Sequence, residues 1–187
     1  DKKNLTGYPD PGAWDDYFPS KTQQMPEEVV PEIWPVNSNK RFYRGHFDWA
    51  PLQISNPDMA DAKVVNWASK QLTKRHKQPI FLSVGIYRPH VPWYVPQHYF
   101  DRFPLDEIQL PAHLSNDLDD LPSAGQAMAK RHWHKWIIEN EQWKKAVQGY
   151  LASLTFADDM VGSLLKALDS GPLSNNTIVV LWGDHGY

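Results

Sequence analysis

Two unbroken apolar runs and two longer periodic stretches dominate the hydrophobic pattern of this chain. The runs at residues 80–85 and 177–182 are rich in β-branched and aromatic side chains, which predicts two fully buried strands. Between residues 59 and 76, and again from 141 to 169, apolar residues recur at helical spacing. Helix, strand, helix and strand therefore follow one another, which is typical of an α/β layer.

Capping residues mark the ends of both predicted helices. Ser55 or Asn56 can cap the first helix, and Pro57 suits its first turn. The second helix is predicted to end at Gly171 and Pro172, because glycine accepts the left-handed turn and proline cannot continue a helix.

Two proline-rich stretches, residues 1–57 and 94–130, show little periodicity and are predicted to be extended loop and turns. We expect the first stretch to wrap a neighbouring surface. An acidic group in the second stretch, at Asp117, Asp119 and Asp120, lacks the glycine turn and the terminal glutamate of an EF-hand loop. It is interpreted as a solvated acidic loop.

Composition narrows the class of protein. The 187 residues are 41% hydrophobic, which is enough for a real core, and they carry a formal net charge of −3. Lysine and arginine are scattered, so we expect no nucleic-acid partner, and no apolar run is long enough to predict a membrane-spanning helix. The absence of cysteine excludes disulfides, thiolate metal sites and a cysteine nucleophile within this segment.

Aromatic residues are abundant, with nine tryptophans and eight tyrosines. They indicate either an aromatic core, which is the commoner case, or a sugar-stacking cleft. Residues 40–49 mix three basic residues with aromatic rings, a composition suited to an anionic or carbohydrate ligand or else to a solvated loop with buried rings. In residues 130–136, His132 and His134 alternate as strand residues would, but no third metal ligand is near.

Candidate chemical groups follow both predicted strands. His90 lies between Pro89 and Pro92, which hold its backbone extended, and Asp184 and His185 occupy a Gly-Asp-His-Gly turn. If the two strands are parallel neighbours, these side chains open onto one rim of the sheet. A purely structural role for His90 is the alternative, since single histidines are more often structural.

Four stretches taken in order carry a family resemblance, namely residues 78–93, 150–153, 158–168 and 177–186. Together they resemble the formylglycine-dependent sulfatases, and most of all the iduronate-2-sulfatase-like branch. The resemblance implies an α/β fold, an alkaline-phosphatase-like sandwich of a mostly parallel sheet between helices. This chain would form part of its single catalytic domain, with residues 1–57 as a loop-rich wrapping segment and residues 58–187 as the core.

The resemblance also implies hydrolysis of sulfate esters, with sulfated carbohydrate as the expected substrate. It assigns the sulfate-contacting and leaving-group role to His90. Asp184 and the neighbouring His185 become ligands of a divalent metal, calcium or else magnesium, although a histidine nitrogen is an unusual partner for calcium. Further substrate-binding candidates are Arg88, Arg44 and His46.

The chain departs from the family pattern in three respects. It lacks the Cys/Ser-x-Pro-x-Arg motif that becomes formylglycine, the N-terminal Asp-Asp metal pair and the lysine beyond the Asp-His turn. We therefore expect an internal fragment, inactive alone, whose partner is the remainder of the sulfatase polypeptide. A secreted, periplasmic or lysosomal location is the family-level expectation.

Two other functions are compatible with these residues. A phosphodiesterase or phosphonate hydrolase of the same superfamily is one, because phosphate and sulfate esters are nearly isosteric. The other is a non-catalytic sulfated-glycan-binding or scaffold remnant that uses residues 40–49 and 130–136.

Overall fold

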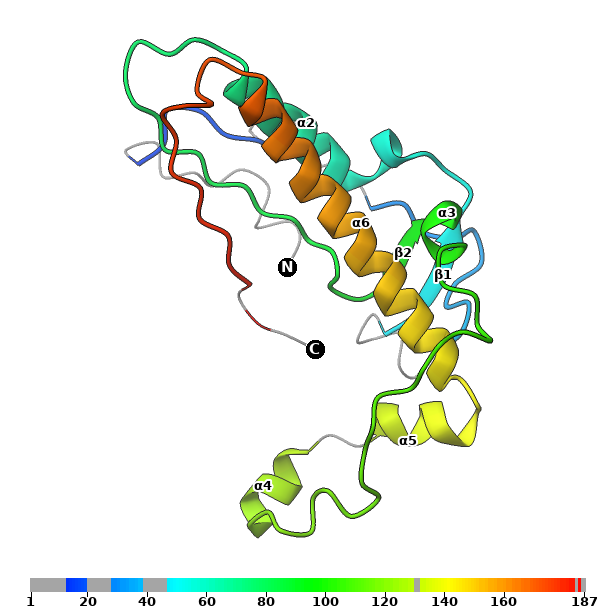
Figure 1. Ribbon diagram of the computed structural model, residues 1–187. Helices are drawn as coiled ribbons and strands as arrows, with labels where there is room; N and C mark the ends of the chain where they lie inside the picture. The colour runs from blue at the N-terminus through cyan, green and yellow to red at the C-terminus, as the bar shows by residue number, and fades with distance from the viewer. Residues whose placement is uncertain (1–12, 20–27, 39–46, 130–131, 184, 186–187) are drawn as a thin grey trace. The chain divides into compact units, whose positions relative to one another are not determined.

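The computed structural model describes residues 13–19, 28–38, 47–129, 132–183 and 185 (Figure 1). The chain divides into two compact units. Unit 1 comprises residues 1–27, 60–86 and 158–187, and unit 2 comprises residues 28–59 and 87–157. The long helix α6 (Trp143–Asp169) contributes its first part to unit 2 and its last part to unit 1.

Unit 2 is built around a two-stranded parallel sheet. Strand β1 (Trp49–Leu52) pairs with β2 (Trp93–Pro96), so that Trp49 lies opposite Trp93. Both strands lie in stretches that we expected to be loop. The expectation was wrong because it took the proline in each strand as evidence against strand structure. In a two-stranded sheet every strand is an edge strand, where the missing proline N–H is tolerated.

Short helical elements complete unit 2. The 3-10 helix η1 (Asn56–Asp58) begins after Ser55, whose hydroxyl donates to the Asp58 carboxylate at 2.7 Å. Helices α3 (Gln97–Phe100) and α4 (Ser123–Met128) interrupt the second predicted loop, which is a further correction. The acidic residues at 117, 119 and 120 are exposed on turns, as the loop interpretation requires.

Helix α5 (His132–Glu139) replaces the strand-like alternation suggested for residues 130–136. That interpretation was wrong because the aromatic and aliphatic residues Trp133, Trp136 and Ile137 repeat at helical, not strand, spacing. These three residues contribute to the core of unit 2.

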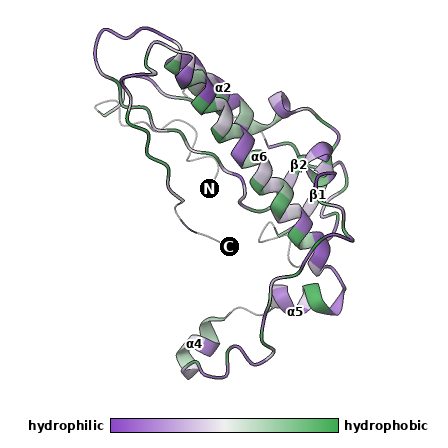
Figure 2. Ribbon diagram, in the orientation of Figure 1, coloured by the Kyte–Doolittle hydropathy of each residue, from purple (hydrophilic) through white to green (hydrophobic). Residues whose placement is uncertain are grey.

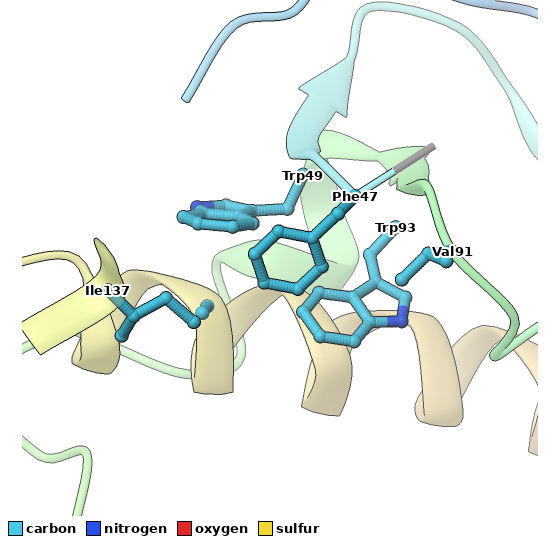
Figure 3. Packing of buried hydrophobic residues seen from close by; sticks show 6 residues of the cluster. Phe47, Trp49, Val91, Trp93 and Ile137 are labelled. Atoms are coloured by element: carbon cyan, nitrogen blue, oxygen red, sulfur yellow. The ribbon is translucent and has the colours of Figure 1, made fainter. Parts of the chain in front are cut away.

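The core of unit 2 is an aromatic cluster (Figure 3). The Phe47 ring contacts Trp49 and Trp93 edge-on, at centroid distances of 5.5 and 5.9 Å, and stacks on Trp133 at 4.5 Å. These are the arrangements that aromatic rings prefer. These rings therefore support the interpretation of the aromatic residues as core packing rather than as a sugar-stacking cleft.

Two glycines of α6 offer a matched test of this packing. A Cβ on Gly149 would lie 2.7 Å from Cβ of Trp49, whereas a Cβ on Gly162 meets nothing within 4 Å. We expect Gly149→Ala to lower the free energy of unfolding by about 1–3 kcal/mol, because overpacking outweighs the gain in helix propensity. Gly162→Ala should raise it by about 0.5–1 kcal/mol. Urea unfolding of the full-length polypeptide measures both, and equal effects would contradict the close approach at Gly149.

Unit 1 contains α2 (Ala60–Leu72) and the last part of α6, at the places where helices were predicted. Helix α2 buries Val65, Ala68 and Leu72 on one face and ends four residues before the expected end. A Cβ on Gly171 would lie 2.8 Å from the Leu72 carbonyl oxygen, so a glycine is required after α6. The predicted glycine stop of α6 is confirmed.

Aromatic contacts in unit 1 link the N-terminal segment to later parts of the chain. The Trp14 ring lies 5.9 Å from the Phe81 ring, and Phe18 stacks on Trp67 of α2 at 6.0 Å. These contacts are of the kind expected if the N-terminal segment wraps a neighbouring surface.

The two predicted strands of unit 1 are not formed among the described residues. Residues 80–85 and 177–182 have no strand pairing there, and Phe81 and Ile178 are 82% and 92% exposed. Hydrophobic residues nevertheless line the segment that approaches the C-terminus (Figure 2). The prediction of buried strands was wrong for this chain because a strand needs a hydrogen-bonded neighbour, and the described residues supply none to either run.

No helix in the described part of the chain has both the length and the apolar character needed to cross a bilayer.

Candidate functional site

His90 lies in a tight turn at the start of the second segment of unit 2. Its backbone N–H donates to the Tyr87 carbonyl at 3.0 Å, and the peptide bonds before Pro89 and Pro92 are both cis. The indole Nε1–H of Trp93, from β2, donates to the Pro89 carbonyl at 2.7 Å. The turn is thus fastened to the strand that follows it.

The imidazole of His90 has a defined orientation. Its Nδ1 lies 2.7 Å from the carbonyl oxygen of Val91, and because a carbonyl can only accept, Nδ1 must carry a proton. In the neutral ring the lone pair is then on Nε2. The half-buried ring therefore has one tautomer in this arrangement, with Nε2 as the nitrogen that can act as an acid or base.

Arg88, a candidate substrate-binding residue, is buried beside this turn. Its Nη2 donates to Glu28 at 2.9 Å and to the Tyr94 carbonyl at 3.3 Å, and its side chain is only 1% exposed. In this arrangement the guanidinium forms an ion pair with the Glu28 carboxylate and a hydrogen bond to the backbone of β2. Contact with an anionic substrate stays a prediction for Arg88.

A buried carboxylate fixes the strands that carry the turn. Asp48, which is 0% exposed, accepts hydrogen bonds from the backbone N–H groups of Val36, Asn37 and Ser38 at 2.6–2.9 Å. The Tyr94 hydroxyl donates to the same carboxylate. The backbone carbonyl of Asp48 accepts from the Trp93 N–H at 2.9 Å. Asp48 therefore ties a loop and both strands into one hydrogen-bonded network.

Of the other four predicted site residues, the structure describes only His185. Asp184, Arg44 and His46 lie outside the described residues. His185 is exposed and belongs to unit 1, whereas His90 belongs to unit 2, so their meeting on one rim stays a prediction.

The donor set does not by itself fit a calcium ion. Calcium takes six to eight oxygen ligands, and the proposed pair offers one carboxylate and one imidazole. Within the described ranges no three His, Cys, Asp or Glu side chains are grouped to hold a metal. Any metal at Asp184 and His185 therefore needs further ligands.

Sequence reasoning missed two contributors to this site, Tyr87 and Asp48. The Tyr87 ring stacks on His90, with centroids 4.8 Å apart and planes at 28°. Its position three residues before His90 was a usable signal, since a turn brings such residues together. For Asp48 no local signal existed, because its partners lie 10–46 residues away.

The family model and the relatives that match this chain agree with one another. The family model described as Sulfatase matches residues 8–187. A protein named sulfatase from Formosa agariphila is 43% identical over 79% of this chain and 30% of its own length. Iduronate 2-sulfatase of Mus musculus is 33% identical over 61% of this chain and 23% of its length.

An arylsulfatase of Clostridium perfringens is 32% identical over 66% of this chain and 25% of its own length. The chain thus spans about a quarter to a third of the length of these relatives.

Proposed function

Because this chain belongs to the sulfatase family, we propose that it is a segment of a sulfuric ester hydrolase in which His90 acts on the sulfate ester. The family match across residues 8–187 is the observation that carries the reaction class. The fixed orientation of the imidazole supports the residue assignment. The alkaline-phosphatase-like α/β fold of the family fits the parallel strand pair and long helices of this partial domain.

The chemistry assigned to His90 follows from its orientation. Cleavage of a sulfate ester leaves charge on the departing alcohol oxygen, and a proton given to that oxygen lets it leave as a neutral alcohol. With Nδ1–H donating to Val91, the other ring proton of the imidazolium is Nε2–H, and we assign the proton transfer to it. The positive charge of the imidazolium also favours contact with sulfate oxygens.

A divalent metal, calcium or magnesium, belongs to this proposal, with Asp184 and His185 as the ligands from this chain. When bound, the metal would neutralise charge on the sulfate oxygens. The remaining ligands and the formylglycine nucleophile would come from polypeptide outside this segment, since no precursor motif occurs within it.

A sulfated carbohydrate is the proposed substrate class. One relative is named iduronate 2-sulfatase, which denotes a sulfated sugar acid. Arg88, Arg44 and His46 are further proposed contacts to the anionic substrate. A location outside the cytoplasm, in a periplasm, a lysosome or the exterior, fits such a substrate and remains part of the proposal.

The reaction class is tested with the full-length polypeptide that contains this segment. We expect turnover of 4-nitrophenyl sulfate to exceed that of bis(4-nitrophenyl) phosphate and of a phenylphosphonate monoester by at least tenfold in kcat/KM. Chelation by EDTA should abolish this turnover, and added calcium or magnesium should restore it. A preference for the phosphate diester would favour phosphodiesterase chemistry, and no turnover of any ester would favour a glycan-binding role.

A further inference from the structure

Tyr87 contacts His90 in two independent ways. Its ring stacks on the imidazole at a centroid distance of 4.8 Å, and its carbonyl accepts the His90 backbone N–H at 3.0 Å. The stacked ring restricts rotation of the imidazole about its side-chain bonds, because any other rotamer would lose this contact.

The Tyr87 hydroxyl also reaches the group that orients the imidazole. It donates to the Val91 carbonyl oxygen at 3.0 Å, while His90 Nδ1 lies 2.7 Å from the same atom. A carbonyl oxygen has two lone pairs, so both donors are accommodated at once. The hydroxyl therefore helps to fix the direction of the carbonyl that selects the Nδ1–H tautomer.

The Tyr87 ring is itself held in place although it is 43% exposed. The Arg88 guanidinium lies 5.3 Å from the ring centroid, within reach of a cation–π contact. That guanidinium is in turn fixed by Glu28 and by the Tyr94 carbonyl. An exposed aromatic ring held by a buried cation and turned onto a histidine is an arrangement that core packing does not require.

We propose that Tyr87 is a positioning residue for His90. Its ring sets the plane of the imidazole, and its hydroxyl adds a smaller contribution through the Val91 carbonyl, so that Nε2 is the nitrogen directed to the sulfate ester. This inference rests on the proposed function, and it adds a residue whose effect on the reaction is exerted through His90.

The test compares Tyr87→Leu with Tyr87→Phe in the full-length polypeptide. Leucine removes the stacking ring, and we expect kcat for 4-nitrophenyl sulfate to fall by roughly 10- to 100-fold with KM within about twofold, since small misplacements of a catalytic group cost this much. Phenylalanine keeps the ring and should retain kcat within about threefold. Tyr87→Gln replaces the leucine variant if that protein does not fold.

A spectroscopic readout separates positioning from folding. With ¹⁵N-labelled histidine, the His90 resonances, identified by their loss in His90→Asn, should indicate the Nδ1–H tautomer in the wild type and in Tyr87→Phe. In Tyr87→Leu we expect a mixture of tautomers. Unchanged tautomer and kcat in the variants that lack the ring would overturn the proposal.

The tautomer readout does not require an active enzyme. If the wild-type polypeptide turns over no sulfate ester, the proposed function fails, while the ¹⁵N spectra still decide whether Tyr87 orients His90.

Discussion

Replacement of His90 by alanine in the full-length polypeptide is expected to lower kcat for an aryl sulfate by about 10²- to 10⁴-fold, the range typical of a lost general acid. The imidazole is held by the Val91 carbonyl and the Tyr87 ring, and alanine removes both contacts together with the ring nitrogens. Steady-state kinetics with 4-nitrophenyl sulfate at saturating substrate measures this loss.

Two further variants make the His90 result specific. The amide of His90→Asn reproduces a donor at the Nδ1 position but offers nothing at Nε2, so it should fold as well as the wild type and be as impaired as alanine. His76→Ala removes an exposed histidine beyond α2 and should leave kcat within about twofold. Wild-type turnover in His90→Ala would exclude a catalytic role for this residue.

Replacement of Asp48 by alanine should produce the largest loss of stability, about 3–5 kcal/mol in the free energy of unfolding. The substitution leaves three part-buried backbone N–H groups and the buried Tyr94 hydroxyl without their shared acceptor. Each unsatisfied buried donor carries a desolvation cost of about 1–3 kcal/mol, partly relieved where water enters. Urea-induced unfolding followed by tryptophan fluorescence measures the change.

Tyr94→Phe is the matched control for Asp48. It removes one donor to the same carboxylate and leaves the other three in place, so we expect a loss of only about 1 kcal/mol. Equal losses for Asp48→Ala and Tyr94→Phe would mean that the backbone donors contribute little to stability.

The helices were predictable from the sequence because their signals are local. Apolar spacing located α2 and α6, and Gly171 marked the end of α6. The structure requires glycine there because of the close approach to the Leu72 carbonyl oxygen, not because of a left-handed φ. The prolines beside His90 correctly indicated a restricted backbone, but the extended conformation predicted for it was wrong, because residues 87–90 close a turn through the hydrogen bond from His90 N–H to the Tyr87 carbonyl.

The other features of the fold and of the site depend on contacts between residues that are distant in sequence. The β1–β2 pair was missed because its strands are short, contain proline and lie more than 40 residues apart. The ion pair of Arg88 joins residues 60 positions apart, and no local pattern indicates it. Residues 80–85 and 177–182 carry a strand-like composition, but pairing needs a neighbouring strand that composition cannot supply.

The exposed run at residues 177–182 has a consequence for handling the protein. Ile178, Val179, Val180, Leu181 and Trp182 are each more than half exposed and form an uncharged, proline-free segment of high β-propensity. Such segments template cross-β aggregation when their backbone lacks a partner. We therefore expect this run to promote aggregation of the polypeptide whenever it is left without a neighbouring strand.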